Sequence, residues 1–152
     1  MNGWLKTAFL ATALYGIAAH PSQASYWHPQ ENGPKRVVID KSQQVLRAYE
    51  GNRLVLETHI SSGRRGRETP NGHFHAQAKD LMHYSRLYGN APMPYSVHLA
   101  GNYFIHGFSS VPDRPASHGC IRVPLTGGNP ARQFYDWVHP GTPVDIVGGQ
   151  RS

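Results

Sequence analysis

The sequence predicts a mainly β protein: a single compact domain built from β-sheet, with one or two short helices. Three observations support this prediction. Short runs of β-branched and aromatic residues alternate with turn residues through most of the chain. Only one stretch, near the C-terminus, has apolar residues at helical spacing. The 152 residues, less an N-terminal export signal, suffice for one domain with its own core.

The first 24 residues are interpreted as a secretory signal peptide. Lys6 supplies a positive charge, and the apolar run 7–19 that follows is uncharged. Ser22 and Ala24 place small residues at a cleavage site, and the run is too short for a membrane-spanning helix. The alternative is an uncleaved anchor. We expect export to the periplasm or cell wall, cleavage before Ser25, and no transmembrane anchor afterwards.

The first half of the mature chain predicts a lead-in over 25–35 and then a run of strands. Residues 36–40 and 44–49 are rich in β-branched and aromatic residues, and residues 53–60 alternate between the two faces of a strand. Gly51 and Asn52 supply turn residues between the second and third of these runs. A polar loop over 61–71 carries three arginines in four positions. The strands expected here are 36–40, 44–49, 53–60 and 73–78.

The second half predicts one helix among further strands. Residues 80–94 are irregular in composition and are expected to form a long covering loop, a type of segment that often acts as a functional lid. Asn129 is a suitable N-cap, Pro130 suits a first helical turn, and apolar residues recur at helical spacing from Ala131 to Val138. The strands expected here are 95–99, 102–106, 121–123 and 143–147.

The formal charge of +6 favours an anionic neighbourhood such as a cell-wall polymer or an acidic membrane surface. Nucleic acid is the other usual partner of a basic chain. An exported protein rarely meets nucleic acid, and the sequence contains no nucleic-acid-binding motif. No nucleic-acid partner is therefore expected.

Cys120 is the only cysteine in the chain. A lone cysteine in an exported domain indicates a reactive thiol or intermolecular pairing. His106 ends a predicted strand, and the following loop can return Cys120 to it, so that the imidazole activates the thiol. Gly119 permits a tight turn whose amides could stabilise an oxyanion, and the carbonyl of Gly107 could orient the imidazole. The segment can thus supply every group that acyl transfer needs.

Other interpretations of these residues stay open at this point. A lone cysteine is commonly a small hydrophobic residue, although polar neighbours argue against that for Cys120. His106, His118 and Cys120 could bind zinc, with more ligands from His73 and His75, but their spacing matches no established zinc pattern. The arginines of the polar loop could be solvated or could meet an acidic substrate; they are Arg64, Arg65 and Arg67.

The segment from His106 through SHGCIRV resembles the catalytic motif of the L,D-transpeptidases (YkuD-type domain), in which a histidine precedes a Ser/Thr-His-Gly-Cys run. Four further segments are similar to the family and fall in its order: RVVIDKSQQVLRAYEGNRLV, SSGRRGRETPNGHF, MPYSVHLAGNYFIHG and GTPVDIV. The resemblance covers residues 36–147. It implies a catalytic domain over 36–148 of the same type.

The resemblance implies a cysteine acyltransferase that acts on peptidoglycan stem peptides through a thioester acyl-enzyme. Cys120 would be the nucleophile and His106 the general base, oriented by Gly107. No metal or organic cofactor is implied. The family pattern would place Ser117, His118 and Gly119 in the pocket, the last two supplying oxyanion amides together with the amide of Cys120, and would make Arg122 and Tyr95 substrate-side residues.

Two departures from the family affect substrate preference more than reaction class. The interval 107–116 is short, and Phe108 stands where many members have a small polar residue. The acyl acceptor is left open between another stem peptide, a lipoprotein lysine and water. With water, the same site would make an L,D-carboxypeptidase or wall amidase. The non-enzymatic alternative is a secreted wall-binding or zinc-binding module, and the oligomeric state is not predicted.

Overall fold

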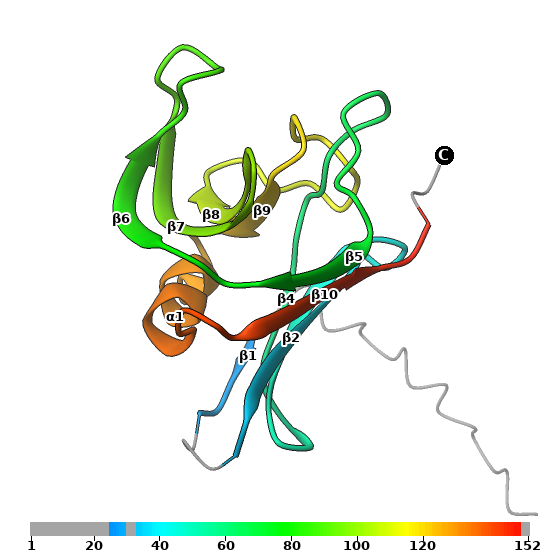
Figure 1. Cartoon of the computed structure of the whole chain (residues 1–152), viewed down its shortest axis with the longest axis vertical. Coiled ribbons are helices and arrows are strands. Elements are labelled where there is room, and N and C mark those ends of the chain that lie inside the picture. Colours follow the sequence, from blue (N-terminus) through cyan, green and yellow to red (C-terminus); the bar gives the residue numbers. More distant parts are fainter. Residues whose placement is uncertain (1–24, 30–32, 150–152) are drawn as a thin grey trace, which may run out of the picture.

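The computed structural model describes residues 25–29 and 33–149 (Figure 1). This part of the chain is mostly strand with one helix, which confirms the predicted fold class. The predicted signal peptide lies outside the described residues. The strands are β1 (Tyr26–Trp27), β2 (Lys35–Asp40), β3 (Val45–Glu50), β4 (Arg53–His59), β5 (Gly72–His75), β6 (Lys79–Tyr84), β7 (Pro92–Ala100), β8 (Tyr103–Phe108), β9 (Ile121–Pro124) and β10 (Pro143–Val147), and the helix is α1 (Pro130–Trp137).

The larger sheet has the order β1-β4-β3-β2-β10-β5. The predicted strands 36–40, 44–49 and 53–60 correspond to β2, β3 and β4, which form an antiparallel meander. The C-terminal strand β10 pairs parallel with β2, with Val144 opposite Val37. The lead-in is more ordered than predicted, because Tyr26 and Trp27 pair with β4. The two ends of the described chain thus lie in one sheet.

The smaller sheet has the order β6-β7-β8-β9 and corrects one prediction. Residues 80–94 are a β-hairpin rather than a covering loop, since β6 pairs antiparallel with β7 and only the tip 85–91 is a turn. Pro92 is the first residue of β7, a position at which a strand tolerates proline. The pairing continues through β8, and β9 runs parallel to β8.

The core contains buried aliphatic residues from both sheets, together with the apolar face of α1. The helix begins as predicted: the Asn129 side chain accepts a hydrogen bond from the Arg132 amide, and Pro130 occupies the first turn. It ends earlier than predicted, because Val138 is extended. Within residues 25–29 and 33–149, no helix has the length and apolar character to cross a membrane. The helix contacts β7, β8 and β9 of the smaller sheet and β4 of the larger one.

Candidate active site

The parallel pair β8–β9 brings the predicted nucleophile and base to one face of the smaller sheet. His106 lies directly opposite Arg122 in the register. Cys120 directly precedes β9, and its side chain lines the same cavity as His106 and Arg122. Ile105, Ile121 and Val123 point to the other side, into the core. The alternation that builds the core therefore also directs His106 and Arg122 to the opposite side of the sheet, where they line a cavity.

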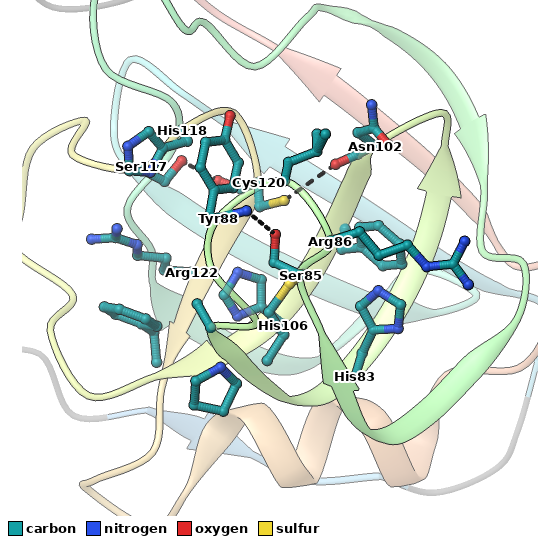
Figure 2. A pocket seen from close by; sticks show the side chains of 16 residues that line it. His83, Ser85, Arg86, Tyr88, Asn102, His106, Ser117, His118, Cys120 and Arg122 are labelled. Carbon is teal, nitrogen blue, oxygen red and sulfur yellow. Dashed lines mark hydrogen bonds between the residues drawn. The ribbon is translucent and has the colours of Figure 1, made fainter.

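These side chains line a cavity of about 460 Å³ (Figure 2). Five of the residues predicted for the site line it: His106, Ser117, His118, Cys120 and Arg122. The sequence did not predict a group of other lining residues, among them His83, Arg86, Tyr88, Asn102 and Phe104.

His106 is held as a neutral base. Its side chain is almost fully buried, with 5% of the residue exposed, and Nδ1 donates to the carbonyl oxygen of Gly107 at 2.9 Å. A carbonyl only accepts, so Nδ1 carries the proton and Nε2 of the neutral ring has a free lone pair. Burial lowers the pKa of His106 to about 4, opposed by the bond to Gly107 and reinforced by the charges of Arg122 and His83.

The thiol of Cys120 is protonated in the resting site. Burial raises its pKa, although the Phe104 amide and the Arg122 charge act in the opposite direction. Within the described residues, Sγ donates to the carbonyl oxygen of Asn102 at 3.4 Å, and no hydrogen bond joins it to the His106 ring. The two groups line one cavity, and in this arrangement the thiol is hydrogen-bonded to Asn102 and not to the imidazole. The resting pair is a neutral thiol and a neutral imidazole.

The turn Ser117–Cys120 is shaped by its own serine. The Ser117 hydroxyl donates to the carbonyl oxygen of Cys120 and accepts from the Gly119 amide at 3.1 Å. Gly119 has φ +127°, a conformation that side chains disfavour, and a Cβ there would lie 3.1 Å from the Tyr103 ring. In the described part of the chain, the amides of His118 and Cys120 donate to no protein acceptor. Those two amides, rather than that of Gly119, are open to an oxyanion.

A buried network behind this turn fixes its position. The hydroxyl of Thr69 donates to the carbonyl of Gly119 at 2.7 Å and accepts from the amide of Gly63 at 2.9 Å. A Cβ on Gly63 would lie 2.0 Å from the Arg67 carbonyl and 2.9 Å from the Gly119 Cα, so only glycine fits. Ser61 exchanges backbone hydrogen bonds with Arg122. The polar loop 61–71 is thus the support of the catalytic turn, a role that its composition did not reveal.

The two predicted substrate-side residues lie in different places. Arg122 lines the cavity and its guanidinium lies 4.1 Å from the centre of the Phe108 ring. This stacking gives Phe108, the departure from the family pattern, a structural part in the site. Tyr95 does not line the cavity: its ring packs edge-on against Tyr135, with ring centres 5.8 Å apart.

The hairpin tip 85–91 forms the opposite wall. The Tyr88 ring stacks on the imidazole of His118, with ring centres 4.3 Å apart and planes at 26° (Figure 2). Leu87, beside it, is 61% exposed. The Tyr88–His118 stack thus joins the tip to the turn Ser117–Cys120.

The zinc interpretation would need three or more ligand side chains close together. Among the residues that the structure describes, no group of three histidine, cysteine, aspartate or glutamate side chains could hold a metal ion. His73 instead pairs with Asp145 at 2.6 Å on the larger sheet.

Known proteins share this architecture. The family model of the L,D-transpeptidase catalytic domain (YkuD) matches residues 34–146. The L,D-transpeptidase of Stackebrandtia nassauensis is 24% identical with a TM-score of 0.69, over 82% of this chain and 60% of that one. That of Xylanimonas cellulosilytica is 34% identical with a TM-score of 0.63, over 78% and 63%. That of Enterococcus faecium is 23% identical with a TM-score of 0.64, over 76% and 50%. The chain thus spans less than two thirds of these proteins, and no curated protein sequence matches it.

Proposed function

Because this chain belongs to the L,D-transpeptidase catalytic domain family, we propose that it is a cysteine acyltransferase that modifies peptidoglycan stem peptides through a thioester acyl-enzyme. The observation that carries the proposal is the common face of β8 and β9, on which a thiol and a proton-accepting imidazole line one cavity. The described residues 25–29 and 33–149 supply each group that acyl transfer needs.

In the first half-reaction, Nε2 of His106 takes the thiol proton as Sγ of Cys120 attacks the carbonyl carbon between the diamino acid and the terminal D-alanine. The oxyanion accepts hydrogen bonds from the amides of His118 and Cys120. When the carbon–nitrogen bond breaks, the imidazolium returns its proton to the departing amine. D-Alanine leaves, and the stem remains bound as a thioester.

In the second half-reaction, an amine acceptor attacks the thioester and gives a proton to His106. The carbon–sulfur bond breaks, and the thiolate regains the proton from the imidazolium. Gly107 keeps Nε2 directed at the reacting atoms throughout, because its carbonyl holds Nδ1–H. For the proton transfer, Sγ exchanges its hydrogen bond to the Asn102 carbonyl for one to Nε2 of His106.

We also propose that the chain is exported and meets its substrate in the periplasm or cell wall. The N-terminal charge, the short apolar run and the small residues at Ser22 and Ala24 support this. N-terminal sequencing of the protein recovered from the producing cell tests it: a mature chain starting at Ser25 is expected, and an intact Met1 in the cytoplasm would contradict it.

Product analysis tests the acyltransferase. Purified protein is incubated with a disaccharide-tetrapeptide, and the masses of the products and of the protein are measured by mass spectrometry. A cross-linked dimer and a stem adduct on Cys120 are expected, and both disappear in Cys120→Ala. Free tripeptide without dimer would make water the acceptor and the protein an L,D-carboxypeptidase. No product and no adduct would contradict both.

A further inference from the structure

Besides apolar side chains, arginines and histidines line the cavity around Cys120, and none of its described lining residues is a carboxylate. Arg86 and Arg122 line it on opposite sides of the Cys120–His106 pair in the view of Figure 2. Three imidazoles, including His118, line it as well. Among the residues that the structure describes, no aspartate or glutamate contributes to this lining. A site of this composition favours a substrate that carries negative charge.

The loop 61–71 places two more arginines beside the turn Ser117–Cys120, although they do not line the cavity itself. Arg64 and Arg67 are exposed, but their backbone is fixed: the Arg64 amide donates to the Ser117 carbonyl at 3.0 Å, and the Arg67 amide to the Arg64 carbonyl at 2.9 Å. Burial, followed by the charges of Arg64, Arg122 and Arg67, lowers the pKa of His118. The backbones of Arg64 and Arg67 therefore lie beside the turn that carries His118, and the charges of all three arginines act on its ring.

The carboxylate of the same loop, Glu68, forms no ion pair with these three arginines. Glu68 accepts a hydrogen bond from the Gly66 amide at 2.8 Å, and the charges of Arg65 and Lys41 help to lower its pKa. In the described part of the chain, no ion pair involves Arg64, Arg67 or Arg122. Glu68 is thus engaged on the Arg65 side of the loop.

We propose that Arg64, Arg67 and Arg122 form a subsite for the side carboxylates of the donor stem, so that the enzyme selects stems with free carboxylates over amidated ones. The inference rests on the proposed function and adds its substrate class. A guanidinium pairs with a carboxylate through two parallel hydrogen bonds, and a neutral primary amide cannot replace that pair. The Phe108 ring orients the Arg122 guanidinium for such pairing. Arg122 is half-buried, and partial burial strengthens the attraction between its charge and a carboxylate.

The arrangement fits a stem peptide better than a long wall polyanion. Arg122 lies within the cavity, on the same sheet face as Cys120. Arg64 and Arg67 lie at the same end, beside the catalytic turn, and not along an extended track. A polymer with evenly spaced charges would contact only the two exposed arginines, Arg64 and Arg67.

Binding to a protein that cannot react separates recognition from chemistry. Cys120→Ala is titrated calorimetrically with two synthetic tetrapeptide stems, one with free side carboxyl groups and one with those groups as primary amides. The terminal D-alanine carboxylate is free in both. We expect the free acid to bind about tenfold more tightly, and added sodium chloride to reduce the difference.

Variants in the Cys120→Ala background locate the preference. Arg64→Gln with Arg67→Gln is expected to reduce the tenfold ratio to about twofold, while the corresponding lysine pair retains part of it. Arg122→Gln is expected to remove it. Arg53→Gln, an exposed arginine at the start of β4 outside the cavity, is the matched control and leaves the ratio unchanged.

Equal binding of the two peptides, binding of neither, or a preference that survives all three Gln substitutions would overturn the subsite. Inorganic polyphosphate that binds through Arg64 and Arg67, with no discrimination between the peptides, would assign the patch to a polymer instead. Acylation of wild-type Cys120 is measured separately with both peptides. Its absence would contradict the proposed function while the binding result stands.

Discussion

The two walls of the cavity are built differently. The wall that carries the proposed nucleophile is the turn Ser117–Cys120, held from behind by Thr69 and Gly63 through buried hydrogen bonds. The facing wall is the hairpin tip 85–91, which is largely exposed and reaches the turn through the Tyr88–His118 stack. Buried, mutually bonded groups hold a geometry, whereas exposed ones adapt at low cost. One wall is suited to fixing reacting atoms and the other to accommodating substrate.

The largest effect is expected from removing the proposed base, His106, which lines the cavity together with the turn residue Cys120. His106→Ala should lower kcat/KM for stem-peptide transfer by about 10²–10⁴-fold, because it removes the cavity imidazole that the Gly107 carbonyl holds with Nε2 able to accept a proton. Alkylation of Cys120 at neutral pH should slow as well. The matched control is His83→Ala, a cavity imidazole with no assigned part in the reaction, which should cost far less. Equal alkylation rates in wild type and His106→Ala would remove the base from the mechanism.

The second prediction tests whether Thr69 supports the nucleophile wall. Thr69→Val removes a hydrogen bond to the Gly119 carbonyl and one from the Gly63 amide, both in a buried site, at nearly constant volume. The free energy of unfolding should fall by about 2–3 kcal/mol in urea denaturation. Thr69→Ser keeps the hydroxyl and should cost less than about 1 kcal/mol. Equal losses in the two variants would mean that the methyl group, and not the network, matters.

The depressed pKa of His106 gives a pH dependence with a defined sign. Between about pH 6.5 and about pH 4 the unfolded state binds the proton and the folded state does not. Stability should therefore fall as the pH falls through this window, by up to about 1.4 kcal/mol per pH unit, and level off below it. Urea denaturation at a series of pH values measures the slope, and His106→Gln should flatten it. The wild-type acid limb of kcat/KM should likewise lie near pH 4, and a limb near 6.5 would contradict a buried neutral base.

The sequence predicted the local parts of this architecture and missed those that depend on distant contacts. Strands rich in β-branched residues, such as β2 and β10, were predicted within a residue or two. Strand β6 was missed because Lys79–Tyr84 contains no β-branched residue and the prolines near β7 indicated a loop. The hydrogen bonds between β6 and β7 stabilise this segment as a strand, although its residues have a low intrinsic β-propensity.

The same division holds for the site. Cys120, His106 and Arg122 could be predicted together because a short motif and strand alternation fix their common face. Thr69 and Gly119 lie 50 residues apart in the chain, and nothing local to either residue predicts their hydrogen bond. The choice of Asn102 as partner of the thiol depends on the turn between β7 and β8. Serine hydroxyls often accept hydrogen bonds from nearby backbone amides. Ser117 was therefore a signal in the sequence that one amide of the turn, that of Gly119, could be bound within the protein.

The smallest effect is expected on the adaptable wall. Tyr88→Ala removes an aromatic stack from a largely exposed residue, so the free energy of unfolding should change by no more than about 0.5 kcal/mol. Access should change more than stability: Cys120 should react about two- to fivefold faster with a bulky maleimide, because the stack covers the turn. Iodoacetamide, a small reagent, should react at the wild-type rate, and Tyr88→Phe, which keeps the ring, should behave as wild type with both. If Tyr88→Ala lowered stability as much as Thr69→Val does, the hairpin tip would be a structural wall like its counterpart, and the cavity would have no adaptable side.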